Sequence, residues 1–425
     1  MPDITVGFAG MTHLGLVSAA AVSSKGFAVL GYDPDEGLIE RLRACDLPVL
    51  EPGLNELVSG NTCLRFSATP EDLNGCDIVY IATDVPTDDM GTSELSGIHA
   101  LIGKVSVHLR DKAILVILCQ VPPGFTRALP LDKERLLYQV ETLIFGRAVE
   151  RATQPERYIV GCADPSRPLP NVYRTLLETF SCPIMPMRYE SAELSKISIN
   201  ICLVASISVA NTMSEICERI GASWNEIVPA LKLDKRIGPY SYLAPGLGIA
   251  GGNLERDLAT TIRMGEEWGT DFGIIRSWIA NSRHRRNWAL KTLHEKVLVK
   301  QPDPLIAVWG LAYKENTHST KNSPSLYTIR QLAPYRIRMY DPAIPGDNSG
   351  LPRAMRSASP MEALKDADVL MVLTPWPQFR QISITEMEKS MKGSIVIDPY
   401  GILDKREMGK TVLRHLVLGE PAGVI

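Results

Sequence analysis

The chain of 425 residues lacks the features that mark several large classes of protein. None of its eight cysteines forms a C-x-x-C pair, which gives neither a zinc-binding spacing nor a disulfide framework and favours a reducing compartment. Its 45 basic and 48 acidic side chains nearly balance, so no charge excess suits nucleic acid or a membrane surface. A content of 45% hydrophobic and 22% charged residues argues against disorder.

Long uninterrupted apolar runs are missing as well. The longest candidate, 201–210, contains Ser206 and Ser208 and is shorter than the roughly 20 residues that a membrane span requires. We therefore expect it to be a buried helix. The first residues, Met1-Pro2-Asp3, carry an acid where a signal peptide carries basic residues. The sequence thus predicts a soluble, cytoplasmic protein without a membrane segment.

Strand-like and helical segments alternate near both ends of the chain, which predicts two doubly wound α/β domains. Length alone suggests about three domains. Helix is expected from Ser191 to about Leu231 and from Leu254 to about Val299, followed by a proline-bearing linker at 300–304. We place the domain boundaries at 1–190, 191–300 and 301–425, and the two α/β domains resemble each other only in type. Strands are expected at 4–8, 27–33, 64–66, 78–83, 113–119, 183–187, 305–309, 336–340, 369–374 and 394–398.

The first strand runs into a glycine-bearing turn that resembles a dinucleotide fingerprint, Gly10-x-Thr12-x-x-Gly15. Glycines allow a tight turn and close helix–strand packing, and the N-terminus of the following helix faces a pyrophosphate. Thr12 replaces the middle glycine, and its hydroxyl is a possible hydrogen-bond donor. Alone, the motif suits an ordinary strand–helix turn equally well.

An acid at the end of the second strand strengthens the dinucleotide hypothesis. Asp33 lies 23 residues after Gly10, where a carboxylate holds ribose hydroxyls and repels a 2′-phosphate, which favours NAD over NADP. The alternative for Asp33 is a helix N-cap for 36–44. We group His13, Leu14 and Thr83 with this cofactor set; for His13, a phosphate contact and a surface position are equally good interpretations.

Several further motifs occur in an order that resembles the UDP-glucose/GDP-mannose dehydrogenase family over essentially the whole chain. The resemblance implies two Rossmann-like domains, a long central helix that builds a homodimer, NAD as cofactor and no metal. It also implies oxidation of a primary alcohol of a nucleotide-linked sugar to a carboxylate. The motifs are Glu51-Pro52-Gly53-Leu54, Val121-Pro122-Pro123-Gly124, Glu193-Leu194-Ser195-Lys196 with Asn200, Arg236-Ile237-Gly238, Pro245-Gly246-Leu247-Gly248, Gly310-Leu311-Ala312-Tyr313-Lys314, Ser323-Pro324-Ser325, Tyr340-Asp341-Pro342, and Trp376 with Phe379-Arg380.

By this resemblance, Lys196, Asn200 and Asp257 match the family's central catalytic set. Lys196 and Asn200 are four residues apart, so one helix face presents both. A lysine and an acid can accept the alcohol proton and stabilise a developing alkoxide. The alternatives are a solvated helix lysine and an acid at the start of a helix. The resemblance also assigns one residue to the cofactor, Lys321, and five to the substrate: Arg236, Tyr242, Gly248, Lys314 and Tyr400.

The departures from the family pattern concern the catalytic set itself. Asn253 stands where the family carries its cysteine nucleophile, and no cysteine follows Cys217. An amide cannot form a thiohemiacetal or a thioester. Gln120 replaces a threonine, and Phe145 replaces the second of two glutamates. Glu141, the first glutamate, remains as an acid or base for a water.

Three more segments bear on the substrate or the surface. The segment 316–321 stands where the family has acids followed by an arginine, and His318 could replace one of the acids. Tyr400 occupies a segment, 398–401, that lacks the family's arginine, which puts the usual substrate in doubt. The basic run 283–286 is interpreted as a solvated helix face.

Two functions of different class follow. The first is an NAD-dependent oxidoreductase acting on a primary alcohol of a nucleotide-linked sugar or nucleoside without a cysteine thioester. It would stop at the aldehyde, oxidise the hydrated aldehyde directly with Asn253 holding the gem-diol, or oxidise transiently. The second is a non-catalytic relative, either a nucleotide-sugar sensor or a partner subunit. The retained Lys196, Asn200 and Asp257 favour the enzyme.

Overall fold

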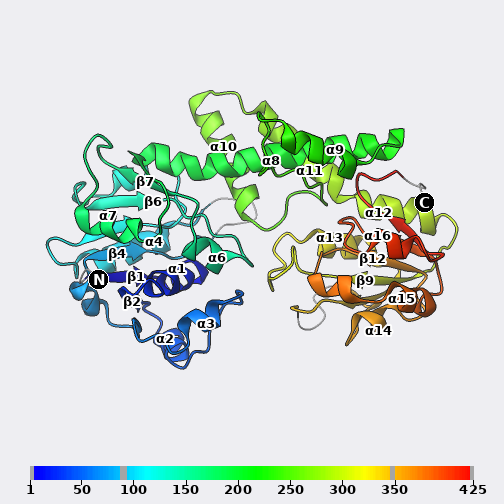
Figure 1. The fold of residues 1–425 in the computed structure, drawn as a ribbon, viewed down its shortest axis with the longest axis horizontal. Helices are drawn as coiled ribbons and strands as arrows, with labels where there is room; N and C mark the ends of the chain where they lie inside the picture. The colour runs from blue at the N-terminus through cyan, green and yellow to red at the C-terminus, as the bar shows by residue number, and fades with distance from the viewer. Residues whose placement is uncertain (1–3, 87–92, 345–349, 422–425) are drawn as a thin grey trace. The chain divides into compact units, whose positions relative to one another are not determined.

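The computed structural model of the chain describes residues 4–86, 93–344 and 350–421 (Figure 1). The chain divides into two compact units, residues 1–199 and 200–425. Met1-Pro2-Asp3, on which the signal-peptide expectation depends, lies outside the described residues. The α/β fold class predicted from the sequence is confirmed in both units.

Unit 1 is built on an eight-stranded sheet in the order β3-β2-β1-β4-β5-β6-β7-β8. Neighbouring strands are parallel except β6 and β7, which are antiparallel. The helix α1 lies beside α6 and packs against β1 and β2. The strands are β1 (Thr5–Ala9), β2 (Ala28–Tyr32), β3 (Leu64–Ser67), β4 (Ile78–Ile81), β5 (Ile114–Ile117), β6 (Leu136–Gln139), β7 (Tyr158–Cys162) and β8 (Ile184–Arg188). The helices are α1 (His13–Ser23), α2 (Glu36–Arg43), α3 (Leu54–Val58), η1 (Pro70–Gly75), α4 (Ser96–Ser106), α5 (Phe125–Ala128), α6 (Ala148–Thr153) and α7 (Asn171–Glu178).

The central strands of unit 1 are buried on both faces, as their continuous apolar sequences require. Along β4, Ile78 and Tyr80 belong to one core cluster, whereas Val79 and Ile81 belong to the other. Because side chains alternate across a strand, the two clusters are the two faces of one sheet. This sheet fixes the strand ends from which the candidate site residues follow.

The central helical region differs from the sequence prediction in where its helices break. The expected helix from Ser191 to Leu231 is two helices, α8 (Tyr189–Ile220) and α9 (Trp224–Leu233), and the boundary between the units falls within α8. The break follows Gly221, whose φ of +82° is left-handed, and Pro229 lies inside α9. The expected helix from Leu254 to Val299 is four segments: α10 (Asn253–Trp268), α11 (Gly273–Arg286), α12 (Trp288–Leu293) and the π-helical turn η2 (His294–Leu298).

Among the described residues, α8 alone meets the length and apolarity of a membrane-crossing helix, and 39% of its most apolar window is buried. The same criteria are met by long helices that pack within a protein. Residues 201–210 are helical as expected, within α8, but the expectation that this segment is buried holds only in part: Val204, Ser208 and Ala210 are buried, whereas Leu203 and Val209 are exposed.

The carboxyl-terminal part of unit 2 carries a six-stranded parallel sheet in the order β11-β10-β9-β12-β13-β14. Its strand order is the same as that of the first six strands of unit 1, the doubly wound order. The strands are β9 (Leu305–Trp309), β10 (Arg336–Tyr340), β11 (Ala354–Arg356), β12 (Val369–Val372), β13 (Ile395–Ile397) and β14 (Arg414–Leu416). The helices are α13 (Pro324–Gln331), α14 (Pro360–Leu364), η3 (Pro377–Gln381), α15 (Ile384–Ser390) and α16 (Lys405–Met408).

The two sheets also share the geometry of their first turn. The Gly10 amide donates to the Tyr32 carbonyl, and the Gly310 amide donates to the Tyr340 carbonyl, both at 2.8 Å. Both glycines have a φ of +96°. The prediction that the two domains resemble each other only in type is therefore wrong, because they match in strand order and in turn geometry.

Candidate functional site

The turn after β1 is built so that only glycine fits at its two ends. A Cβ on Gly15 would lie 1.8 Å from the Gly10 carbonyl oxygen. A Cβ on Gly10 would lie 2.8 Å from the Thr83 Cβ. Thr12 is the N-cap of α1, and its hydroxyl accepts a hydrogen bond from the Asp84 amide at 2.8 Å. The turn thus brings Gly10, Thr12, Gly15 and Thr83 together at the N-terminus of α1, where unpaired amides favour an anion.

Asp33 keeps acceptor capacity that the equivalent acid of the second sheet has lost. Its Oδ2 accepts from the Met11 amide at 2.7 Å, its Oδ1 accepts from the Asp35 amide, and the side chain is partly exposed. Asp341, at the same place in unit 2, is buried and accepts from four backbone amides and the Trp376 indole. A carboxylate has about four lone-pair sites, so Asp33 alone has room for ribose hydroxyls.

The alternative role for Asp33, capping the second helix, is taken by another residue. The N-cap of α2 is Asp35, whose side chain accepts from the Leu38 amide. Asp33 is therefore not the cap, which leaves the ribose interpretation of the carboxylate as the one that fits its position.

His13, the first residue of α1, is a buried anchor and not a surface residue. It is 7% exposed, its Nε2 lies 2.8 Å from Glu51 Oε1, and its ring stacks on Phe145 at a centroid distance of 4.1 Å. Glu51 also accepts from the amides of Gly146 and Ala148. One buried carboxylate therefore fastens the glycine turn, which also holds Leu14, to the loop after β6.

That same loop positions the first pair of candidate catalytic groups. Glu141 follows β6, and its Oε2 lies 3.3 Å from Lys196 Nζ on α8. Both side chains are largely buried, at 16% and 10% exposure. A buried, paired lysine is not the solvated helix lysine that was the alternative interpretation.

The second pair lies in unit 2 and joins α8 to α10. Asn200 Nδ2 donates to Asp257 Oδ2 at 2.5 Å, and Arg256 Nε lies 3.5 Å from Asp257 Oδ1. All three residues are buried. A buried carboxylate held by a charge and an amide at fixed distances suits proton transfer or charge stabilisation better than a solvated acid at a helix start does.

The loop before α10 is packed around glycines and ends at Asn253. A Cβ on Gly248 would lie 2.5 Å from the Ser282 carbonyl oxygen, and one on Gly252 would lie 3.3 Å from the Lys321 side chain. Lys321 is therefore placed beside this loop. Asn253 is the exposed first residue of α10, four residues and about one turn before Asp257.

The remaining candidate substrate residues occupy two different settings. Burial raises the pKa of the Tyr400 phenol, and the charge of Glu315 raises it further. Partial burial and the same acid raise the pKa of Tyr242, which is 52% exposed. Lys314 Nζ lies 5.6 Å from the centroid of the ring of Tyr313, the residue before it in the chain. Arg236, by contrast, is exposed and paired with Asp234.

Sequence reasoning gave no role to Glu193, which fixes the loop that follows Gln120. Gln120 lies between β5 and α5, and the buried Glu193 accepts from the amides of Gly124 at 2.6 Å and Thr126 at 2.9 Å. Burial raises the pKa of this carboxyl although the two amides oppose the shift. The signal was its place in the Glu193–Lys196 motif, three residues before the candidate lysine on α8.

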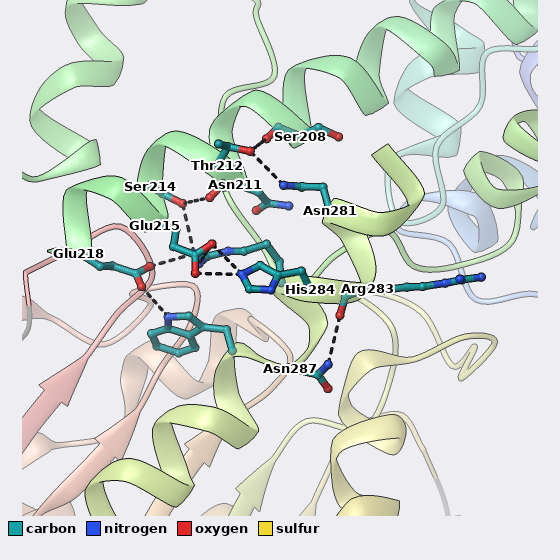
Figure 2. Close-up of polar contacts among 12 residues, drawn as sticks. Ser208, Asn211, Thr212, Ser214, Glu215, Glu218, Asn281, Arg283, His284 and Asn287 are labelled. Atoms are coloured by element: carbon teal, nitrogen blue, oxygen red, sulfur yellow. Dashed lines mark hydrogen bonds and ion pairs between the residues drawn. The ribbon is translucent and has the colours of Figure 1, made fainter. Parts of the chain in front are cut away.

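The basic run 283–286 is only partly the solvated face that the sequence suggested: Arg283 and His284 are exposed, whereas Arg285 is buried (Figure 2). Arg285 is 1% exposed and lies 2.9 Å from Glu218 and 3.5 Å from Glu215. His284 also contacts Glu215, and Arg286 pairs with Glu255. Acids on α8 and α10 therefore pair with His284, Arg285 and Arg286, an arrangement that helical periodicity alone does not reveal.

Comparison with known proteins gives three matches that follow one another along the chain. They are to the UDP-glucose/GDP-mannose dehydrogenase family: its NAD binding domain at residues 4–181, its central domain at 190–283 and its UDP binding domain at 307–405. The NAD-binding match covers the Gly10–Gly15 turn and Asp33, whose free acceptor sites fit the ribose of NAD. NAD is therefore the cofactor of this chain.

Individual proteins agree over nearly the full length. The chain is 29% identical to a UDP-glucose 6-dehydrogenase of Pseudomonas aeruginosa, covering 97% of this chain and 96% of that protein. It is 28% identical to the UDP-glucose 6-dehydrogenase TuaD of Bacillus subtilis, covering 97% and 92%. A solved UDP-glucose dehydrogenase of Pyrobaculum islandicum is similar at a TM-score of 0.81, with 26% identity and 97% of each chain covered.

A solved UDP-D-ManNAc dehydrogenase of Pyrococcus horikoshii shares the fold at a TM-score of 0.82, with 23% identity over 98% of this chain and 99% of that one. The strand order, the glycine turn and these matches along the whole chain agree with one another. The chain belongs to the UDP-glucose/GDP-mannose dehydrogenase family.

Proposed function

We propose that this protein oxidises a primary alcohol of a nucleotide-linked sugar, or of a related nucleoside, without forming a cysteine thioester. The observation that carries the proposal is the coexistence of two buried polar pairs on α8 with an asparagine at 253. Lys196 is paired with Glu141, and Asn200 is bonded to Asp257. The relatives' substrates, UDP-linked sugars, indicate the class of substrate.

The chain's own residues account for the first oxidation as follows. Lys196 and Asn200 are four residues apart on α8, so their side chains leave the helix from the same face. The substrate hydroxyl proton passes to the Glu141 carboxylate, and the Lys196 ammonium stabilises the developing alkoxide. Asp257 and Asn200 orient the hydroxyl or a water beside it. The chemistry that NAD supplies, when bound at the Gly10–Gly15 turn, is acceptance of the hydride.

Asn253 sets the limit of the reaction. Its amide offers no nucleophile for the aldehyde carbon, so the aldehyde is released or reacts as its hydrate. In the hydrate route, a solvent water adds to the aldehyde and one hydroxyl proton of the diol passes to Glu141. With a second NAD bound at the Gly10–Gly15 turn to accept the hydride, the product would be the carboxylic acid, which loses its remaining proton to solvent to give the carboxylate. Asn253 holds the diol by hydrogen bonds in that route.

We also propose that two copies of the chain pair through α8. Its exposed side chains include Val209, Met213, Ile216 and Ile220, which recur at intervals of three and four residues. This spacing gives one apolar stripe along a helix, and an exposed stripe of this kind marks an interface. A second copy presents the same stripe, so the contact is self-complementary.

The test is a panel of nucleotide sugars and nucleosides with NAD, followed by NADH absorbance and by mass spectrometry of the product. An aldehyde with one NADH, or a carboxylate with two, supports the proposal, and Lys196→Met should abolish either. If no member of the panel is oxidised even at high enzyme, while nucleotide sugars still bind, the protein is instead a non-catalytic nucleotide-sugar binder. Zero net NADH with an altered sugar would indicate transient oxidation and would refute the proposed end product.

A further inference from the structure

The loop before α10 is anchored in the protein at one residue, Ile249. Its side chain is 3% exposed and belongs to a core cluster with Val204 of α8 and Leu258 of α10. Val204 lies four residues after Asn200 on α8, and Leu258 directly follows Asp257 on α10. The loop is therefore packed against both helices that carry the second candidate pair.

The backbone of Ile249 is held from a third helix, α11. Its amide donates to Ser282 Oγ at 2.7 Å, and its carbonyl oxygen accepts from Arg286 Nη2 at 3.1 Å. Ser282 and Arg286 are four residues apart on α11, so one face of that helix presents both groups. Any movement of this residue away from α11 therefore breaks a hydrogen bond, and a buried backbone group left without a partner is costly.

Arg286 also contacts the chain beyond Asn253. The same Nη2 lies 3.4 Å from Glu255 Oε1, in the first turn of α10. Ile249 lies four residues before Asn253 in the chain, and Glu255 lies two residues after it. One guanidinium group therefore bridges both ends of the segment 249–255, and Asn253 lies within that segment.

The neighbours of Arg286 restrict the orientation of its guanidinium group. The side chain is 19% exposed, and its Cζ lies 5.5 Å from the centroid of the Tyr327 ring on α13. The Tyr327 hydroxyl donates to Asn287 Oδ1 at 3.2 Å, and Asn322 Nδ2 donates to Glu255. An arginine that stacks on an aromatic ring presents its planar donors with little loss of entropy. This bridge therefore differs from an exposed ion pair, which contributes little.

We propose that Arg286 is a positioning residue for the oxidation, because it holds Asn253 and the start of α10 in place for the substrate. The inference rests on the proposed function, in which Asn253 holds the diol. Arg286 itself contacts neither the substrate nor the cofactor in this role. A displacement of about 1 Å in a reacting group can lower a rate roughly 100-fold, so a bond that keeps the loop closed affects kcat from outside the reacting set.

The first test is hydrogen exchange of the full chain without substrate, comparing Arg286→Met with wild type. The amides of Ile249 and Arg256 are both hydrogen-bonded in the structure, so their exchange reports opening of the loop. Loss of a charge-assisted bond should make this exchange roughly tenfold faster or more. The matched control is Arg283→Met, which removes an exposed arginine three residues earlier on α11 and should leave the exchange unchanged.

The second test is steady-state kinetics with a nucleotide sugar that the wild-type protein oxidises. Arg286→Met should lower kcat roughly tenfold or more and leave the Kd for NAD unchanged, because the cofactor turn lies in unit 1. Arg286→Lys keeps the charge and should retain more of kcat than Arg286→Met does. In an Asn253→Ala background, Arg286→Met should cause little further loss of kcat, because both changes act on the same segment.

Faster exchange confined to residues 248–257, together with a loss of kcat that depends on Asn253, supports the proposal. Equal exchange in Arg286→Met and Arg283→Met would overturn it. Faster exchange throughout unit 2 would also overturn it, because Arg286 would then support the whole fold and not this segment. So would effects of Arg286→Met and Asn253→Ala on kcat that multiply. If the wild-type protein oxidises no nucleotide sugar, the proposed function fails, and the exchange comparison by itself still decides whether Arg286 holds the loop.

Discussion

Replacing Glu51 tests whether one buried carboxylate fastens the NAD turn to the loop that carries Glu141. Its side chain is fully buried and accepts from His13 Nε2 and the Gly146 amide at 2.8 Å and from the Ala148 amide at 3.2 Å. Glu51→Ala leaves these three donors without an acceptor. Each unsatisfied buried donor costs about 1–3 kcal/mol, so the loop should lose roughly 3–9 kcal/mol of local stability.

Hydrogen exchange of the segment containing Gly146 and Ala148 measures this loss directly. A decrease of about 3 kcal/mol corresponds to exchange roughly 150-fold faster. Glu150→Ala is the matched control, since Glu150 lies nearby on α6 but is exposed and paired with Arg147 at the surface. Such pairs contribute little, and exchange should be unchanged.

The reasoning is refuted if Glu51→Ala and Glu150→Ala exchange alike. It is also refuted if the faster exchange extends over all of unit 1 without a preference for the loop, because the carboxylate would then support the whole fold and not this link. In the first case the loop is held by the stacking of Phe145 on His13 alone.

Three further predictions concern the cofactor, the dimer and acid stability. Gly15→Ala should abolish NAD binding measured by calorimetry, because its Cβ would lie 1.8 Å from a backbone oxygen, whereas Gly103→Ala, with open space around it, should bind NAD normally. Val209→Asp/Ile216→Asp should convert a dimer into a monomer in light scattering, and Val107→Asp, at an even more exposed apolar position outside α8, should not; an unchanged mass would count against α8 as the interface. Asp368 has a pKa held below its ordinary value by the Leu305 amide, Gln301 and Lys392, which together outweigh burial, so it stabilises the fold at neutral pH and loses that contribution as the pH falls through its folded-state pKa. Asp368→Asn should therefore melt at a lower temperature than wild type at pH 7 and at a similar one near pH 3; an equal difference at both values would contradict this.

The strands that the sequence predicted are either continuously apolar, as at 305–309, or alternate in polarity, as at 336–340. Those of both sheet centres, such as 305–309 and 336–340, were found at their predicted positions. Four strands were not predicted: β6, β7, β11 and β14. β11 and β14 have only three residues each, whereas β6 and β7 are mainly apolar and of ordinary length; β7 lies antiparallel to β6, a pairing that depends on tertiary contacts and not on local pattern. The breaks within the long helices were missed for the same reason, although Gly221 marked one of them.

For the candidate site, sequence gave residue types but not partners. Lys196 and Asn200 were named from the family resemblance, whereas their bonds to Glu141 and Asp257 join residues more than fifty positions apart. The position of His13 at a cofactor turn suggests a phosphate contact. Only the fold reveals that its Nε2 is hydrogen-bonded to Glu51 instead. The partners of buried charged groups lie far away in the sequence, so a local sequence pattern does not predict which residues pair.

The most direct test of the central claim is intact-mass analysis of the enzyme during turnover with NAD and a nucleotide sugar that it oxidises. The amounts of NADH and of product are measured in the same reaction. We expect the wild-type protein to consume substrate with no adduct of substrate mass on any of its eight cysteines. Asn253→Cys should accumulate such an adduct and release carboxylate with two NADH. A covalent substrate adduct on a cysteine of the wild-type protein, formed and lost at the rate of turnover, would contradict the account.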